Sequence, residues 1–136
     1  MKKSITREDS FGCSIACIAW ITNKSYKRAK KEYFKDANSA HIFGYLCRDL
    51  VAALAKLKKQ YSYKYLKGKI KVSWRLYLLP KKIQAISHWH YLVKTSEGCM
   101  DPWINFGYRN ADLNMANSGF RKRLPGKPIY VILPRV

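Results

Sequence analysis

Residues 10–22 are apolar on nearly all sides of a predicted helix, and this segment limits the folds open to the chain. Its apolar side chains cover two sides of that helix: Ile15, Ile18 and Ala19 on one, and Cys13, Cys17 and Trp20 on the other. A helix without a polar face is buried in a core or a membrane. The uncharged stretch is shorter than the about 20 residues that cross a bilayer. We therefore expect the rest of the chain to cover this helix in a membrane-independent protein.

Two further helices are predicted before residue 60. The second spans residues 26–34, and Asn23 and Ser25 before it are suitable caps. The third spans residues 42–59 and has the most regular helical spacing in the chain. Its apolar stripe contains Phe43, Leu46, Cys47, Leu50, Leu54 and Leu57.

Strand patterns begin after Gln60, where three tyrosines alternate with polar residues. We expect strands at residues 61–65, 72–79, 83–86, 89–94 and 128–133, a break at Pro80, a hairpin loop at 95–98 and irregular structure at 105–119. Helices therefore come first and strands follow. This order predicts an α+β fold, and the length predicts one domain over residues 1–136.

Positive charge is the most unusual bulk property, because 27 Lys and Arg stand against 8 Asp and Glu, a formal charge of +19 at pH 7. No acidic residue lies between Asp49 and Glu97. We expect basic residues from 56 to 82 to form one face that binds an acidic protein or a nucleic acid. The candidate anion-binding residues are Lys56, Lys58, Lys59, Lys64, Lys67, Lys69, Lys71 and Arg75. The alternative is a solubilising charge without a specific partner.

The four cysteines predict neither a metal site nor a disulfide framework. None is part of a C-x-x-C pair, which zinc sites commonly use. Their apolar neighbours are typical of free thiols in a reducing compartment. The first ten residues lack the apolar run of a signal peptide. We expect a protein without cofactor or metal, located in the cytoplasm or delivered into the cytosol of a target cell.

Cys13 lies in the first turn of the predicted apolar helix, directly after Gly12. N–H groups and the helix dipole at that end favour the thiolate, the reactive form of cysteine. For this residue taken alone, a buried structural thiol is the commoner alternative. Cys17 lies one turn deeper and gains less from the dipole, so we expect it to act as a packed apolar side chain.

A histidine and a carboxylate in the second half of the chain favour a catalytic role for Cys13 over a structural one. His90 lies on the predicted strand 89–94, and Asp101 follows just after the hairpin loop. A carboxylate on a paired strand can hold an imidazole in the tautomer that accepts a proton from a thiol. The order of Cys13, His90 and Asp101 therefore predicts a catalytic triad, with the sulfur within about 4 Å of the nearer imidazole nitrogen.

Three short motifs resemble the bacteriocin-processing cysteine peptidases, the papain-like family that removes double-glycine leaders. Residues 12–20, Gly-Cys-Ser-Ile-Ala-Cys-Ile-Ala-Trp, are similar to the nucleophile helix of that family. Residues 90–93, His-Tyr-Leu-Val, resemble its histidine strand, and residues 100–102, Met-Asp-Pro, resemble its aspartate strand. The resemblance implies a papain-like fold in which helices pack on an antiparallel sheet.

The same resemblance implies a role for each site residue. Cys13 is the expected nucleophile, His90 rather than His88 the expected base, and Asp101 the expected orienting acid. Arg7 occupies the position at which the family has the glutamine of its oxyanion hole, so Arg7 becomes the candidate oxyanion donor. Ser14 also departs from the family, which has glycine directly after the nucleophile.

The predicted function is a cysteine-dependent hydrolase or acyl-transfer enzyme that acts on a protein or peptide. Peptide hydrolysis and glutamine deamidation both use such a triad, and the sequence leaves both open. A second possibility is a basic nucleic-acid-binding module on the same fold, in which tyrosines among the lysines stack on bases. A third is a toxin or effector with an RNase-like site made of His88, His90 and Lys94, which gives Cys13 no role.

Overall fold

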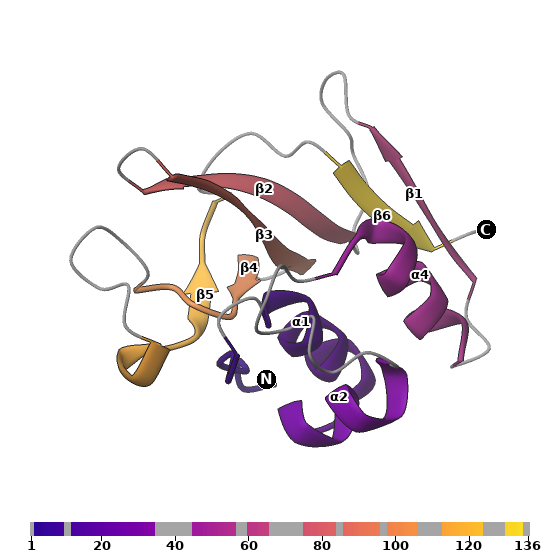
Figure 1. Ribbon diagram of the computed structural model, residues 1–136, viewed down its shortest axis with the longest axis horizontal. Helices are drawn as coiled ribbons and strands as arrows, with labels where there is room; N and C mark the ends of the chain where they lie inside the picture. Colours follow the sequence, from indigo (N-terminus) through magenta and orange to yellow (C-terminus); the bar gives the residue numbers. More distant parts are fainter. Residues whose placement is uncertain are drawn as a thin grey trace.

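Helices and strands occupy separate layers, and the helices lie on one side of a curved antiparallel sheet (Figure 1). The computed structural model describes residues 2–9, 12–34, 45–56, 60–65, 75–83, 86–95, 98–105, 113–123 and 130–134. The helices are α1 (Cys13–Thr22), α2 (Tyr26–Tyr33) and α4 (Cys47–Ala55), with a 3-10 turn at Leu113–Met115. The strands are β1 (Tyr61–Tyr65), β2 (Arg75–Ile83), β3 (Ile86–Thr95), β4 (Gly98–Asp101), β5 (Gly119–Arg121) and β6 (Tyr130–Pro134). This is the expected α+β class.

The sheet has the order β1-β6-β2-β3-β4-β5, and its described strand pairs are antiparallel. β3 and β4 form the expected hairpin, in which Thr95 pairs with Gly98 and Val93 with Met100. The last strand, β6, lies between β1 and β2 rather than at an edge. β1 and β5 are the outer strands of the described sheet.

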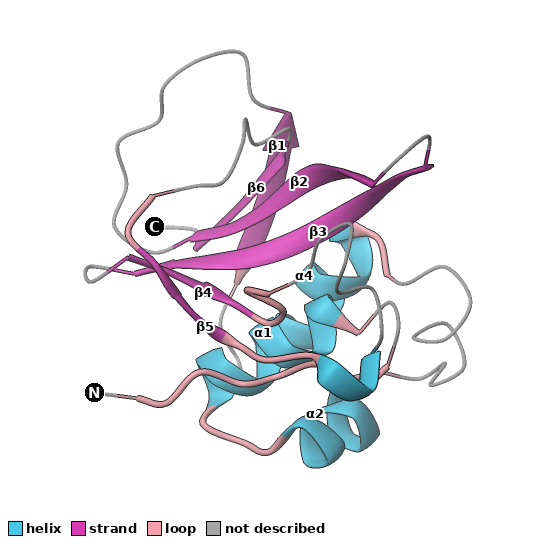
Figure 2. Cartoon of the chain, turned by 90° about the vertical axis from the view of Figure 1, so that its left-hand side faces the viewer, coloured by secondary structure: helices cyan, strands magenta, loops and turns pink. Residues whose placement is uncertain are grey.

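Helix α1 is the centre of the core, as its apolar composition predicts. Every residue from Cys13 to Trp20 is buried. α1 packs against α2 and α4 and against β3 of the sheet (Figure 2). Because neighbours cover it on all sides, α1 needs no polar face.

Helix α2 is amphipathic, and one of its sides is buried. Ser25 caps its start, where the side-chain oxygen accepts a hydrogen bond from the N–H of Arg28 at 3.2 Å. Tyr26, Ala29 and Tyr33 recur at helical spacing and are buried. The helix ends at Tyr33, one residue before the predicted end.

Helix α4 is shorter at its start than the sequence predicts. Leu46 precedes the helix, and its N–H donates to the carboxylate of Asp49 at 2.8 Å, an N-terminal capping contact. Because Leu46 lies outside the helix, its side chain is 58% exposed, so its assignment to the apolar stripe is wrong. Cys47, Leu50 and Leu54 do form a buried stripe. The predicted positions Phe43 and Leu57 lie outside the described residues.

Two strand predictions need correction. β2 runs without a break through Pro80, which pairs with Trp89 of β3. The described pairing of β2 with β6 involves only residues 76–78. Pro80 therefore lies beyond the part of β2 that is bonded on both sides, where a residue without an N–H is tolerated. The alternation of tyrosines with polar residues in β1 predicts inward tyrosine rings beside outward lysines, but the Tyr63 side chain is 47% exposed.

Candidate active site

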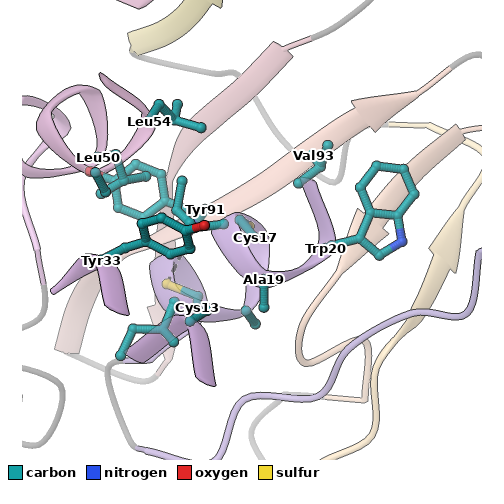
Figure 3. Close-up of a cluster of buried hydrophobic side chains, with 14 of the residues drawn as sticks. Cys13, Cys17, Ala19, Trp20, Tyr33, Leu50, Leu54, Tyr91 and Val93 are labelled. Carbon is teal, nitrogen blue, oxygen red and sulfur yellow. Dashed lines mark hydrogen bonds between the residues drawn. The ribbon is translucent and has the colours of Figure 1, made fainter. Parts of the chain in front are cut away.

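The sulfur of Cys13 lies where the first turn of α1 meets β3. Its Sγ accepts a hydrogen bond from the backbone N–H of Tyr91 at 3.4 Å, drawn as a dashed line in Figure 3. The residue is 4% exposed and borders the apolar core. Cys13 is the first residue of α1, so the sulfur also lies near helix N–H groups that have no partner within the helix.

The loop before Cys13 is fixed by a buried carboxylate. Asp9 accepts a hydrogen bond from the Tyr26 hydroxyl at 2.6 Å and pairs with the Lys30 ammonium at 3.0 Å. The Asp9 carbonyl accepts from the N–H of Gly12 at 3.0 Å. A Cβ on Gly12 would lie 1.9 Å from the Tyr26 oxygen, so only glycine fits between this cluster and the helix start. These contacts define where α1 begins and therefore where the sulfur lies.

His90 and Asp101 form a buried pair on neighbouring strands. His90 Nε2 lies 2.7 Å from Asp101 Oδ1, and the two side chains are 1% and 0% exposed. Since Val93 pairs with Met100, alternation places His90 and Asp101 together on the opposite face of the β3–β4 hairpin. The expected side-by-side contact of the histidine and the carboxylate is therefore present.

Asp101 accepts hydrogen bonds from Arg121 and Trp103 in addition to its contact with His90. Arg121 Nε donates to its Oδ2 at 2.6 Å, and the N–H of Trp103 donates to its Oδ1 at 2.9 Å. Burial opposes ionisation of the carboxyl, but hydrogen bonds from His90, Arg121 and Trp103 outweigh it and hold the pKa of Asp101 well below its usual range. Asp101 is therefore an ionised carboxylate at neutral pH, and it orients the imidazole.

Arg7 contacts the other nitrogen of the imidazole. Its Nη2 lies 2.6 Å from His90 Nδ1, and Arg7 is 3% exposed. The backbone N–H of Arg7 donates to the carbonyl of Pro102 at 3.2 Å. The guanidinium carbon lies 5.0 Å from the centre of the Trp103 ring, within cation–π range. The N-terminal segment thus delivers a buried positive charge to the site.

The pKa values of the two thiols of α1 shift in opposite directions. Burial raises the pKa of Cys13, but the charge of Arg7, the hydrogen bond and charge of His90 and the N–H of Tyr91 together outweigh burial and bring the pKa to about 6. At Cys17 burial and the neighbouring Cys13 raise the pKa well above the usual thiol value. At neutral pH the site therefore contains a thiolate on Cys13 and a neutral thiol on Cys17.

The structure brings four of the predicted site residues together: Arg7, Cys13, His90 and Asp101. For His88 only the backbone is described, so the choice between the two histidines rests on the contacts of His90. Of the candidate anion-binding residues, Lys56 and Lys64 are described and exposed, and Arg75 is described only in its backbone. The others, Lys58, Lys59, Lys67, Lys69 and Lys71, lie outside the described residues. The continuous basic face therefore stays a prediction.

Arg121 is the site residue that sequence analysis missed. It lies on β5, a three-residue strand next to a segment that was expected to be irregular. Its Nη2 also donates to the carbonyl of Ile104 at 2.9 Å, which fixes the guanidinium against Asp101. With 27 basic residues in the chain, no composition signal distinguishes this arginine from the rest.

Within the described ranges, no group of three or more histidine, cysteine or acidic residues is placed to hold a metal ion. The helices of those ranges also include none with the length and apolar character needed to cross a membrane. No family model matches the chain, and comparisons with curated proteins and with solved structures give no match.

Proposed function

We propose that the protein is a cysteine-dependent acyl-transfer enzyme that acts on a carbonyl group of a protein or peptide. Cys13 is the nucleophile, His90 the base and Asp101 the group that orients it. One observation carries the proposal: a thiol with a pKa of about 6 lies at the start of a buried helix, against a hydrogen-bonded histidine–carboxylate pair. Structural thiols in apolar cores have raised pKa values instead.

The papain-like fold belongs to the same proposal. Its support is the placement of the nucleophile on an N-terminal helix and of the histidine and carboxylate on adjacent antiparallel strands. The described topology agrees with helices packed on one side of an antiparallel sheet. The nucleophile helix, the histidine strand and the aspartate strand come in the same chain order as the three motifs that resemble the bacteriocin-processing peptidases.

The first chemical step is attack of the Cys13 thiolate on the carbonyl carbon. A carbon–sulfur bond forms, and the electron pair of the carbonyl moves to oxygen. Arg7 is the candidate donor to that oxyanion, because its guanidinium has only donors and its charge acts on Cys13. When the carbonyl re-forms, the bond to the leaving group breaks, and Cys13 is left as a thioester. The leaving group takes the electron pair and the proton that His90 accepted from the Cys13 thiol.

The second step releases the acyl group. A water molecule attacks the thioester carbon, gives its proton to His90, and Cys13 departs as a thiolate. An amine acceptor in place of water would give transfer rather than hydrolysis. Peptide hydrolysis and glutamine deamidation share the thioester, so a test of that intermediate addresses both.

Acylation by p-nitrophenyl acetate tests the proposal, because its aryl oxide leaves without needing a proton. We expect a rapid burst of p-nitrophenolate, with one acetyl group located on Cys13 by peptide mass spectrometry. Cys13→Ala should abolish the burst. Cys17→Ala, which removes a buried thiol one turn away, is the matched control and should retain it. A burst that survives in Cys13→Ala, with acetyl groups found on lysines, would refute the proposal.

A further inference from the structure

We propose that Arg121 is a positioning residue of the candidate active site, whose guanidinium fixes the Asp101 carboxylate and thereby the His90 imidazole. Its described side-chain contacts are to Asp101 and to the backbone of Ile104, so it acts on the imidazole through the carboxylate. The inference deepens the proposed function, on which it rests for its effect on a reaction. Its first test uses no acyl substrate, so the two can fail separately.

Arg121 reaches the carboxylate diagonally across two paired strands. β5 lies beside β4 (Figure 1), and Gly119 is directly opposite Asp101. A Cβ on Gly119 would lie only 3.0 Å from Ile104 Cδ1, so this position has little room for a side chain. Arg121, two residues further along β5, is on the same face. Such a diagonal neighbour is within reach of a long side chain.

The contacts of Asp101 are divided unequally between its two oxygens. Oδ1 lies 2.7 Å from His90 Nε2 and accepts from the N–H of Trp103 at 2.9 Å. Oδ2 accepts from Arg121 Nε at 2.6 Å. The terminal torsion of an aspartate has no sharp minimum, so contacts at one oxygen leave the carboxylate able to turn. The donor on Oδ2 fixes its plane and therefore the direction in which Oδ1 faces the imidazole.

Arg121 is itself held by contacts on either side of its guanidinium. Nη2 donates to the carbonyl of Ile104 at 2.9 Å, and the N–H of Ile104 donates to the carbonyl of Asn117 at 2.8 Å. A planar guanidinium bonded to two separate acceptors has a defined orientation. In the backbone, a Cβ on Gly98 would lie 2.3 Å from the Arg121 carbonyl oxygen, so the glycine at the hairpin allows β5 to approach.

The ion pair of Arg121 and Asp101 connects the buried site to solvent. The Asp101 side chain is 0% exposed, whereas that of Arg121 is 26% exposed. A buried carboxylate is costly unless it is paired and hydrogen-bonded. A guanidinium that keeps part of its hydration can pair with it at a smaller desolvation cost. Truncation of Arg121 should therefore leave Oδ2 within reach of a small cation from solution.

Proton NMR of the His90 ring tests the inference without a substrate. An ionised carboxylate only accepts, so Nε2 carries the proton in its contact with Asp101. In wild type we expect this N–H far downfield and in slow exchange with water. Arg121→Met, which removes the charge and the donors, should move the signal upfield and speed its exchange at least about tenfold. Arg28→Met, the control, removes an exposed Nε contact of 2.8 Å to Glu32 and should change neither.

Two further variants separate charge from geometry. Arg121→Lys keeps the charge but lacks the fork that reaches two acceptors, so its ring signal should lie between wild type and Arg121→Met. Arg121→Ala should recover a wild-type-like ring signal when guanidinium ion is added far below denaturing concentrations. The same addition should not restore Asp101→Asn, which lacks the carboxylate that the cation would bind.

Hydrolysis of p-nitrophenyl acetate tests the effect on the proposed reaction. Arg121→Met should keep the burst amplitude, because the aryl oxide leaves without a proton. The steady rate after the burst should fall about tenfold or more, because that rate depends on a correctly placed base for water. In an Asp101→Asn background, Arg121→Met should add little further loss. Losses that multiply would show that Arg121 acts by a route other than the carboxylate.

The inference is overturned if the His90 ring signal and its exchange rate are the same in Arg121→Met as in wild type. A second measurement uses the unmodified protein and does not depend on whether a variant folds. The Nε–H of Arg121 should exchange with water more slowly than that of the exposed Arg28, and equal rates would also refute the inference. A wild type without a burst would count against the acyl-transfer proposal alone, since the ring signal reports the positioning independently.

Discussion

The first and second turns of α1 contain the same kind of residue in different electrostatic surroundings. Cys13 in the first turn and Cys17 in the second are both buried and both belong to the apolar core. Around Cys13 lie a guanidinium, an imidazole and a backbone N–H, and its pKa falls to about 6. At Cys17 burial dominates, and its pKa rises.

The comparison shows that burial alone does not make a thiol inert or reactive. Removal from water raises a thiol pKa in both turns. In the first turn only, side chains of the N-terminal segment and of β3 reverse the direction of the thiol pKa shift. Reactivity in this helix is therefore set by tertiary contacts, and the helix start supplies the place where they converge.

The largest effect that we expect is selective alkylation of the first turn. At pH 7.5 Cys13 should react with iodoacetamide at least about a hundredfold faster than Cys17, because thiolate is the reacting form. The Cys13 rate should rise through pH 6 and level off above pH 7, since its pKa is about 6. Mass spectrometry of a short labelling pulse measures each cysteine separately.

The buried thiols Cys47 and Cys99 serve as internal controls, because burial raises the pKa of each. Comparable labelling of Cys13 and these thiols would show that Cys13 is no more reactive than other buried thiols of the protein.

A smaller effect is expected from Asp101→Asn, which disturbs the contacts behind the first turn. The amide would present a donor to His90 or to Arg121, which both need an acceptor. We expect a loss of about 3 kcal/mol in the free energy of unfolding, as when one member of a buried ion pair is removed. Urea denaturation at pH 7 measures it, and Asp49→Asn, at the capping contact of α4, should cost about 1 kcal/mol.

The Asp101 contribution also has a defined pH window. Its pKa is lowered in the folded protein, so the ionised carboxylate stabilises the fold above the pKa of an unfolded aspartate, about 4. That stabilisation is lost as the pH falls from there toward the folded pKa. The difference between wild type and Asp101→Asn should therefore shrink below about pH 4. A difference that stays constant down to pH 3 would contradict this account.

The smallest effect is expected from Cys17→Ala in the second turn. Loss of a buried sulfur leaves a small cavity and should lower the free energy of unfolding by about 1 kcal/mol. The alkylation profile of Cys13 should not change, because the groups that lower its pKa come from elsewhere. A shift in that profile would show that the two turns are coupled.

Short-range sequence patterns predicted the elements that depend only on residues close together in the chain. The burial of α1, the capping of α2 by Ser25 and the β3–β4 hairpin follow from composition, cap chemistry and turn position. The proximity of His90 and Asp101 followed from that hairpin. Arg121 and the path of β2 through Pro80 depend on which strands become neighbours, and short-range spacing carries no information on that.

The contact of Arg7 with His90 joins positions 83 residues apart, and the contact of Thr6 with Ser118 joins positions 112 apart. β6 must in addition enter the sheet between β1 and β2. On the ribosome, Arg7 and Cys13 therefore emerge long before the strand residues that hold them in the folded site. The nascent chain presents an ordinary thiol, and its sulfur becomes a thiolate at neutral pH only when the completed chain folds.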